Sequence, residues 1–139
     1  MQQNLDRFQF KCWDRDNGIL LPDGTFPLTG WIFDIYYIIT IKTILSDPEK
    51  YSKRFTILQS TGLKDKNGKL IFEYDIIEMY SPNIKGLIFF DDFYSCMKIQ
   101  AIADDGSCQG EATLLTKNFA NGSAIIGNRF EQPQLLKKL

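Results

Sequence analysis

The chain has 139 residues, of which 44% are hydrophobic and 14% aromatic, with 11 Phe and 6 Tyr. This length and composition predict a single folded domain over residues 1–139, rich in β-strands, and exclude a disordered tail. The net charge is −1 and histidine is absent, so general polyanion binding and every site built on histidine are excluded.

The compartment is inferred from the cysteines and the apolar runs. Cys12, Cys96 and Cys108 form an odd set without CxxC spacing, so we expect neither a disulfide framework nor a zinc site. The first residues lack the apolar segment of a secretory signal, and the apolar run 31–45 is shorter than the ~20 residues needed to cross a bilayer. We expect a soluble cytoplasmic protein without a membrane partner.

The first predicted element is a β-hairpin. Residues 7–13 (RFQFKCW) alternate, with two Phe side chains and Cys12 on one face, which predicts a half-buried strand. Asn17-Gly18 provides a tight turn, and residues 18–21 (GILL) predict the returning strand.

The next segments are less regular. Residues 22–30 (PDGTFPLTG) predict a loop, because Pro and Gly are frequent there. Residues 31–45 (WIFDIYYIITIKTIL) suit a long strand or a buried helix, and their Ile, Tyr and Thr content favours the strand. Ser46 stands three residues before Glu49, a capping-box spacing, which predicts one or two helical turns over residues 46–53.

The strand pattern then returns and leads into the most regular stretch of the chain. Residues 54–60 (RFTILQS) predict a strand that continues into residues 61–77 (TGLKDKNGKLIFEYDII). Within this stretch Asp65-Lys66-Asn67-Gly68 predicts a hairpin turn, since Asn and Gly both tolerate positive φ.

The C-terminal half predicts more strands and a short helix. The Asp pair at 91–92 separates two predicted strands, a turn is expected at 104–106, and Pro133 is expected in the first turn of the C-terminal helix. The predicted elements are strands over 84–90 (IKGLIFF), 93–103 (FYSCMKIQAIA) and 123–130 (SAIIGNRF), and a helix over 131–139 (EQPQLLKKL). Strands spaced this closely are typical of a small barrel or sandwich.

Three blocks of the sequence resemble the YopX family of phage and prophage proteins. Residues 58–77 (LQSTGLKDKNGKLIFEYDII) resemble its pattern Q-Y-T-G-L-K-D-K-N-G-K-x-I-Y-E-G-D-I-V. Residues 7–14 (RFQFKCWD) resemble its opening F-R-A-W-D, and residues 124–136 (AIIGNRFEQPQLL) resemble its closing V-I-G-N-I-Y-E-N-P-E-L-L. The blocks keep the family's order and cover about a third of the chain.

The resemblance implies a phage or prophage gene product with a mainly β fold, a small SH3-like barrel at its core, no cofactor and no catalytic residue. Tyr74 stands where the pattern has Gly, from which we expect that this position needs no positive φ. Ser60 replaces the usual Tyr. The residues that carry the family pattern are Thr61, Gly62, Leu63, Asp65, Gly68, Glu73, Asp75, Gly127, Asn128 and Pro133.

Several carboxylates are candidates for chemistry. On a regular strand Glu73 and Asp75 would share one face ~7 Å apart, close enough to share a proton or, with the Asp pairs at 91–92 and 104–105, to hold a cation. We favour a structural role in which Asp75 accepts backbone N–H groups in a turn. No metal ligand is therefore assigned.

Two groups of side chains are candidates for binding. Lys64, Lys66 and Lys69 crowd one hairpin, which could contact phosphates or be a solvated turn; together with Asn67 and Tyr74 they are the candidate binding residues. Aromatic side chains could pack in the core or form a partner surface, and these are Trp13, Trp31, Tyr36, Tyr37, Tyr51 and Tyr94. We expect Cys12 and Cys96 to be buried and Cys108 to be exposed.

The favoured function is a non-enzymatic accessory protein that binds a host or phage protein, with inhibition of a host defence as one possible role. The alternative is a nucleic-acid-binding β-barrel module that uses the lysines. A third hypothesis is a metal-dependent hydrolase built on Glu73, Asp75, Asp91 and Asp92. Self-association through the apolar run 31–45 is a further expectation.

Overall fold

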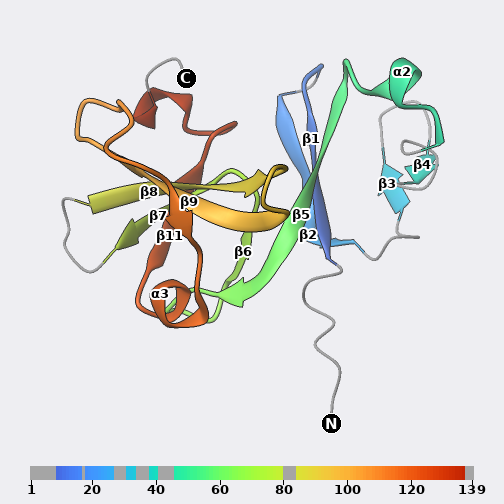
Figure 1. Ribbon diagram of the computed structural model, residues 1–139. Helices are drawn as coiled ribbons and strands as arrows, with labels where there is room; N and C mark the ends of the chain where they lie inside the picture. The colour runs from blue at the N-terminus through green and yellow to red at the C-terminus, as the bar shows by residue number, and fades with distance from the viewer. Residues whose placement is uncertain are drawn as a thin grey trace, which may run out of the picture. The chain divides into compact units, whose positions relative to one another are not determined.

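The structure is a computed structural model of the chain, and it describes residues 9–16, 18–26, 31–33, 38–40, 46–79 and 84–136. The chain divides into two compact units, Met1–Ser60 and Thr61–Leu139, and each is described by itself. Antiparallel strands predominate in the described residues, and helices are short (Figure 1). The prediction of a mainly β protein is confirmed.

The first unit begins with the predicted hairpin. Strand β1 (Phe10–Asp14) pairs antiparallel with β2 (Ile19–Phe26) and with β5 (Phe55–Lys64). Between them lie a second hairpin, β3 (Trp31–Phe33) with β4 (Ile38–Thr40), and helix α2 (Pro48–Tyr51). Strand rather than helix is thus confirmed at 31–33 and 38–40, but the single long strand favoured for 31–45 is wrong, because these two short strands pair antiparallel with each other. Residues 34–37 and 41–45 lie outside the described residues.

Strand β2 is longer than predicted. The loop expected from residue 22 onward is wrong as far as Phe26, because the strand continues through Pro22 and Gly24. Two features explain this. β2 is the edge strand of the order β2-β1-β5-β6, where a Pro without N–H is tolerated. The register also shifts between Phe10 and Cys12, and this bulge absorbs the additional residues.

An ion pair between Asp14 and Arg54 fixes the end of the first hairpin at which the β1–β2 turn lies. Asp14 is 1% exposed, and Arg54 donates to both of its carboxylate oxygens at 3.1 Å. The adjacent Arg15 donates to the backbone carbonyls of Ser52 and Lys53 and to Thr56 Oγ1. These bidentate and charge-assisted contacts tie the β1–β2 turn to the start of β5.

Helix α2 forms where it was predicted, but with a different cap. The backbone N–H of Lys50 donates to Asp47 Oδ1 at 3.3 Å, so the residue that caps the helix is Asp47 and not Ser46. Pro48 then occupies the first helical position, where its missing N–H removes no hydrogen bond. The helix therefore begins with an Asp cap, one residue after the Ser46 that the capping-box spacing indicated.

The second unit is built on a five-stranded antiparallel sheet. The sheet has the order β10-β9-β8-β7-β11, and strand β6 lies beside β5. Helix α3 (Lys117–Asn121) is capped by Thr116, whose hydroxyl accepts from Phe119 N–H. The strands are β6 (Leu70–Phe72), β7 (Asp75–Met79), β8 (Ile84–Asp91), β9 (Cys96–Ile102), β10 (Thr113–Leu114) and β11 (Ala124–Asn128).

The strands predicted over 84–90, 93–103 and 123–130 are confirmed, although β9 begins only at Cys96. The turn expected at 104–106 is also present. β10 and α3 were not predicted, even though Thr116 and Gly122 provide ordinary cap residues at the two ends of the helix.

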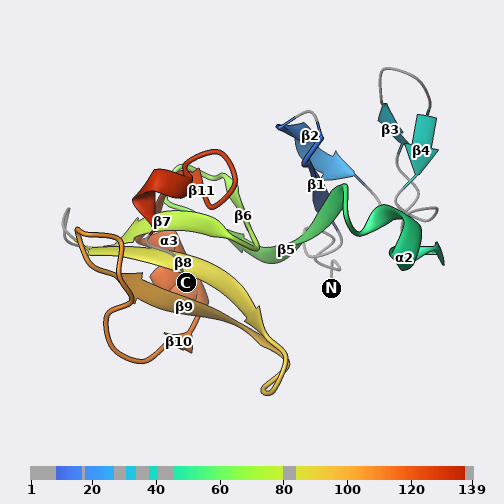
Figure 2. The ribbon, with the colours of Figure 1, turned by 90° about the horizontal axis from the view of Figure 1, so that it is seen from above.

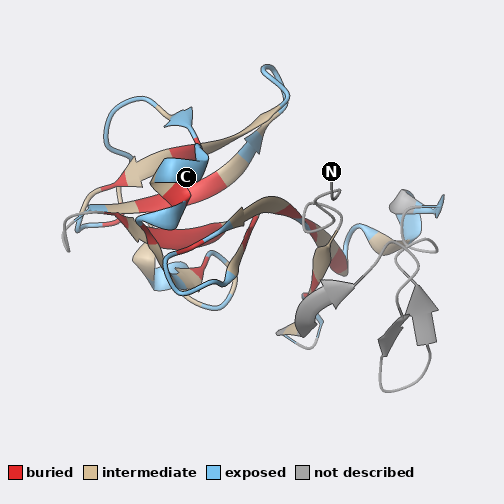
Figure 3. Ribbon diagram, turned by 90° about the horizontal axis from the view of Figure 1, so that it is seen from below, coloured by how far each residue is buried: buried red, intermediate tan, exposed pale blue. Residues whose placement is uncertain are grey.

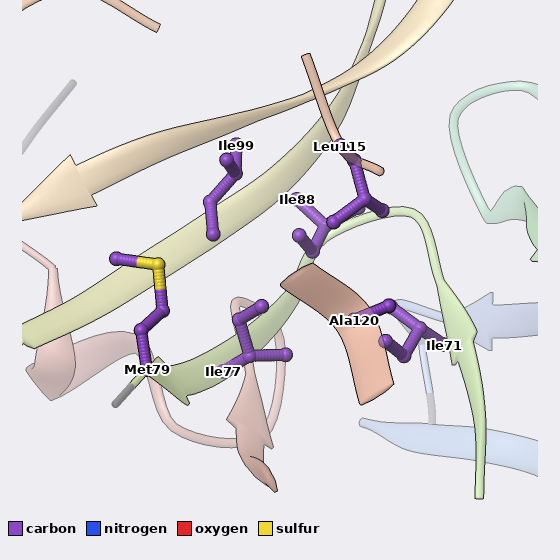
Figure 4. Close-up of a cluster of buried hydrophobic side chains, with 7 residues drawn as sticks. All are labelled: Ile71, Ile77, Met79, Ile88, Ile99, Leu115 and Ala120. Atoms are coloured by element: carbon purple, nitrogen blue, oxygen red, sulfur yellow. The ribbon is translucent and has the colours of Figure 1, made fainter. Parts of the chain in front are cut away.

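Apolar side chains pack on both faces of this sheet. Consecutive residues of β7 point to opposite faces, so Ile76 and Ile77 belong to different clusters. Ile77 belongs to the larger cluster. Figure 4 shows the side chains of this cluster converging from β6, β7, β8, β9 and α3. Ile76 faces a smaller cluster with Leu87 and Ile102. The members of the larger cluster are Ile71, Ile77, Met79, Ile88, Ile99, Leu115 and Ala120.

One prediction about the second unit is not confirmed, and another needs correction. Among the described residues no strand pairing joins the edge strands β10 and β11, so no closed barrel is found and the SH3-like barrel is not confirmed. The C-terminal helix is a 3-10 turn, η2 (Pro133–Leu135), with Pro133 at its start. It ends early because Leu136 is extended and packs with Leu135 against the smaller cluster; residues 137–139 lie outside the described residues.

Candidate functional site

The β5–β6 hairpin is organised by one buried carboxylate. Asp65 is 4% exposed, and its Oδ1 accepts hydrogen bonds from the backbone N–H groups of Asn67 and Lys69, both at 2.9 Å. Its Oδ2 accepts from the N–H of Ile125 in β11 at 3.0 Å. Gly68 has φ 79°, as the predicted turn requires. The turn is confirmed, and Asp65 acts as its internal support.

The same turn displays positive charge. Lys64, Lys66, Asn67 and Lys69 are all exposed, while the carboxylate of Asp65 between them is buried. The backbone N–H of Lys66 donates to the carbonyl of Ser123 at 2.8 Å, so the turn is held in place. The three lysines, here called the lysine hairpin, are therefore brought together on the surface of a fixed turn.

The β6–β7 turn contradicts the expectation for Tyr74. This residue has φ 65°, in the left-handed region, although it is not glycine. The backbone is fixed on both sides, since Tyr74 N–H donates to Ile88 O at 2.7 Å and Tyr74 O accepts from Arg129 N–H at 2.9 Å. The turn between β6 and β7 has only two residues, Glu73 and Tyr74, and this short connection requires the conformation.

The expectation of a shared-proton pair assumed that Glu73 and Asp75 lie on one regular strand, and they do not. Glu73 lies in the turn, whereas Asp75 opens β7 and is 4% exposed. Asp75 Oδ2 accepts from the backbone N–H of Phe72 at 2.9 Å. The structural role favoured for Asp75, acceptance of a backbone N–H in a turn, is confirmed.

The C-terminal block of the family pattern packs beside this turn. Asn128 pairs with Asp75 across β11 and β7, and its Oδ1 accepts from the N–H groups of Phe130 and Glu131. Asn128 N–H donates to Gln132 Oε1 at 2.8 Å. A Cβ on Gly127 would lie 2.6 Å from that Gln132 oxygen, which explains the glycine. Asn128 and Gln132 of the C-terminal block, which are distant in sequence from Asp75, thus pack beside the β6–β7 turn.

An open pocket of about 310 Å³ lies next to Tyr74. The ring of Tyr74 meets that of Phe130 edge to face, with 5.7 Å between centroids, and the Arg129 guanidinium lies 5.3 Å from the Tyr74 centroid. The pocket is lined by Tyr74, Leu87, Phe89, Phe90, Gln100 and Arg129. Of these residues only Tyr74 was a sequence candidate, because strand periodicity alone does not show which half-buried side chains surround a hollow.

The β8–β9 turn carries the most exposed aromatic side chains among the described residues. Phe93 is 85% exposed and Tyr94 is 64% exposed, and their rings meet edge to face at 4.8 Å. We call these two residues the aromatic tip. Figure 2 shows the β8–β9 turn projecting from the sheet, and Figure 3 shows it coloured as exposed. Tyr94 was a sequence candidate and Phe93 was missed.

The aromatic tip is held by polar contacts at its base. Asp91 Oδ1 accepts from the backbone N–H groups of Phe93 and Tyr94, at 2.9 and 3.2 Å. Lys98 Nζ lies 2.9 Å from Asp91 Oδ2 and 4.1 Å from the Tyr94 ring centroid. The hydrogen bond from Lys98 lowers the pKa of Asp91. Asp91 is thus a turn residue, stabilised in its ionised form.

The hydrolase hypothesis gains no geometric support. The carboxylates of Asp75 and Asp91 are engaged in separate turns. Across the described part of the chain, no three His, Cys, Asp or Glu side chains group as metal ligands would. The described residues likewise include no helix long and apolar enough to span a membrane.

The cysteines differ in their surroundings. Cys12 is buried as predicted, and burial, followed by the nearby charge of Asp14, raises its pKa to about 12. Cys108 is exposed as predicted. Cys96 is only half-buried, so that prediction is wrong; the residue begins β9 directly after the exposed turn.

The other aromatic candidates give a mixed result. Trp13 and Tyr51 are half-buried. Trp31, Tyr36 and Tyr37 lie outside the part of the chain whose side chains are described, so their roles stay predictions.

Comparisons with known proteins give one family and one structural likeness. The family model described as YopX protein matches residues 9–137. No curated protein matches the chain. Among solved structures, the chain is similar to protein EF1440 from Enterococcus faecalis, with 24% sequence identity and a TM-score of 0.49; the match covers 93% of this chain and 97% of that one.

Proposed function

This chain belongs to the YopX family, and we propose that it is a phage- or prophage-encoded accessory protein that binds another protein rather than catalysing a reaction. The partner is a host or phage protein, and inhibition of a host defence is one role such binding would serve. A cytoplasmic location, self-association through residues 31–45 and an SH3-like barrel core belong to the same proposal.

The observation that carries this proposal is the exposure of the aromatic tip. Leaving a Phe 85% exposed forgoes the free energy that its burial would contribute, about 1.5 to 3 kcal/mol. Burial of the tip by a partner would recover that free energy. Aromatic side chains are also enriched among the residues that dominate protein interfaces.

The surroundings of the tip favour a protein partner. Asp91 and Lys98 form an ion pair at its base, so the tip carries no uncompensated positive charge to attract a polyanion. The backbone N–H bonds to Asp91 hold the turn, which reduces the entropy lost on binding. An apolar, preorganised protrusion is suited to a pocket on another protein.

The test is a pull-down with the tagged full chain from a lysate of the bacterial host, with and without nuclease. The variant Phe93→Ser/Tyr94→Ser removes the apolar surface of the tip. Leu114→Ser is the matched control, since Leu114 is an apolar residue that is 56% exposed elsewhere on the sheet.

We expect a stoichiometric protein that is retained by the wild type and by L114S after nuclease, and lost with the tip variant. Equal retention by the tip variant would place the contact elsewhere, and recovery that nuclease abolishes would support the second candidate.

The second candidate is a nucleic-acid-binding module. Its specific support is the lysine hairpin, because Asp65 is turned inward and leaves three exposed lysines on one turn. Binding of this kind weakens steeply as salt rises. Retention of single- or double-stranded DNA or RNA at low salt, lost when Lys64, Lys66 and Lys69 are changed to Gln, would establish it.

A further inference from the structure

The pocket beside Tyr74 has a composition that selects a ligand group. Leu87 and Phe89 stand two residues apart on β8, on the same side of the strand. In the β8–β9 ladder they lie opposite Gln100 and Lys98, and Leu87 is 4% exposed. The side chain of Gln100 is engaged, since its Nε2 donates to the carbonyls of Ala101 and Gly110. The pocket therefore combines apolar side chains of β8 with the polar groups of Gln100 and Arg129.

The charged wall of the pocket is Arg129. It is exposed, and its guanidinium lies over the ring of Tyr74. Among the described residues that line the pocket it is the one ionised side chain, and no described carboxylate is within ion-pair distance of it. Its planar donor set therefore lies beside the apolar side chains of Leu87 and Phe89, an arrangement suited to a carboxylate that carries an apolar neighbour.

The position of the Tyr74 ring is maintained at a conformational cost. A non-glycine residue in the left-handed region costs about 1 to 2 kcal/mol. Here the residue in that conformation is an aromatic one whose ring supports Arg129 and forms part of the pocket wall. Glycine at position 74 would remove the backbone strain, but it would also remove the aromatic ring that forms part of the pocket wall.

We propose that this pocket binds a carboxylate of a protein partner together with an adjacent apolar side chain. The carboxylate pairs with Arg129, and the apolar group lies on Leu87 and Phe89. A volume of about 310 Å³ is at the lower end of ligand pockets, so it holds one such group and not a long chain. The inference rests on the proposed function in assigning the carboxylate to a protein.

A nucleic-acid strand fits this pocket less well. Phosphodiester backbones are bound through several cationic contacts along the strand. The pocket offers a single guanidinium, and Lys98, which lies opposite Phe89 in the β8–β9 ladder, is paired with Asp91.

The test is an NMR titration of the ¹⁵N-labelled full chain with N-acetylphenylalanine, which carries a carboxylate and an apolar ring. N-acetylphenylalaninamide is the matched probe without the charge, and a single-stranded hexathymidylate tests the nucleic-acid alternative. We expect a Kd on the order of 1 mM for the acid. The backbone amides of Tyr74, Phe89 and Arg129 should shift.

Variants separate the contributions of charge and ring. Arg129→Gln should weaken binding of the acid by about tenfold, and Tyr74→Gly should weaken it while preserving the fold. Lys117→Gln, which removes one exposed positive charge on α3, should leave binding unchanged. The dispersion of the amide spectrum shows that each variant is folded.

Three results would overturn the inference: equal affinity for the acid and the amide, shifts that avoid the pocket, or binding of the oligonucleotide there in preference to the acid. Absence of any shift at tens of millimolar acid would also overturn it. In each case the pull-down with the tip variant decides the proposed function separately, because the tip and the pocket are changed by different substitutions.

Discussion

The carboxylate of Asp65 accepts a hydrogen bond from the backbone N–H of Ile125 at 3.0 Å, across 60 positions of sequence. The same carboxylate holds the turn that follows it. The most regular stretch of the sequence is thereby tied to the closing strand. It follows that Asp65 is a structural residue.

Asp65 is expected to be important for stability. Asp65→Ala should lower the free energy of unfolding by about 2 to 4 kcal/mol, because three backbone N–H groups would lose the buried carboxylate that accepts from them. Urea denaturation followed by circular dichroism measures this loss. Asp104→Asn, at an exposed turn residue, is the control and should change stability by less than about 0.5 kcal/mol. Equal losses for the two variants would contradict the role of Asp65.

The conformation of Tyr74 gives a prediction that separates the cost of backbone strain from the loss of the aromatic ring. Tyr74→Gly and Tyr74→Ala both remove the ring, but alanine keeps a Cβ at φ 65°. The glycine variant should be more stable than the alanine variant by about 1 kcal/mol. Thermal or urea unfolding of the pair measures the difference. An alanine variant as stable as the glycine variant would mean that the residue is not held in the left-handed region.

Gly86 is expected to be required by close packing in β8. A Cβ at this position would lie 2.5 Å from the side chain of Ile99, which is 2% exposed and packed within the larger cluster. Gly86→Ala should therefore cost about 1 to 3 kcal/mol. The double variant with Ile99→Ala is the control, since the added methyl group should cost less in that background. Additive losses would show that the two residues do not clash.

Cys12 should make stability depend on pH above neutrality. Burial raises its pKa from the ordinary 9.0 to about 12, so the folded state retains a proton that the unfolded state has lost between these values. This contribution to stability is complete below about pH 9 and falls as the pH rises toward 12, by at most about 1.4 kcal/mol per pH unit.

The comparison that isolates this effect is the unfolding free energy of the wild type and of Cys12→Ala at several values from pH 8 to pH 10.5. Other groups titrate equally in both proteins, so the difference between the two curves reports Cys12. Curves that remain parallel would refute a raised pKa. At pH 8 iodoacetamide should modify the exposed Cys108 and leave the buried Cys12 intact in the native protein.

Local patterns predicted most of the strands correctly. The alternation in β1 and the Asp65–Gly68 turn depend on residues close in sequence, and both were confirmed. The extension of β2 through Pro22 was missed, because Pro is tolerated there only at a sheet edge, and edge position is set by pairing with distant strands.

The candidate site was harder to predict for the same reason. Tyr74 was expected to have an ordinary φ, since an aromatic residue normally avoids the left-handed region. Hydrogen bonds with Ile88 and Arg129 override that preference, and both partners are remote in sequence. The aromatic tip was only half found, because a pair of Asp residues beside a pair of aromatics does not show that both rings will be exposed.

The most direct test of partner binding through the aromatic tip is site-specific photo-crosslinking in living host cells. p-Benzoylphenylalanine is introduced at Phe93, which is 85% exposed, and in a separate protein at Leu114, which is 56% exposed and serves as the control. The account predicts a discrete protein adduct from position 93 that is absent from position 114. An adduct of equal yield at both positions, or only at 114, would contradict it.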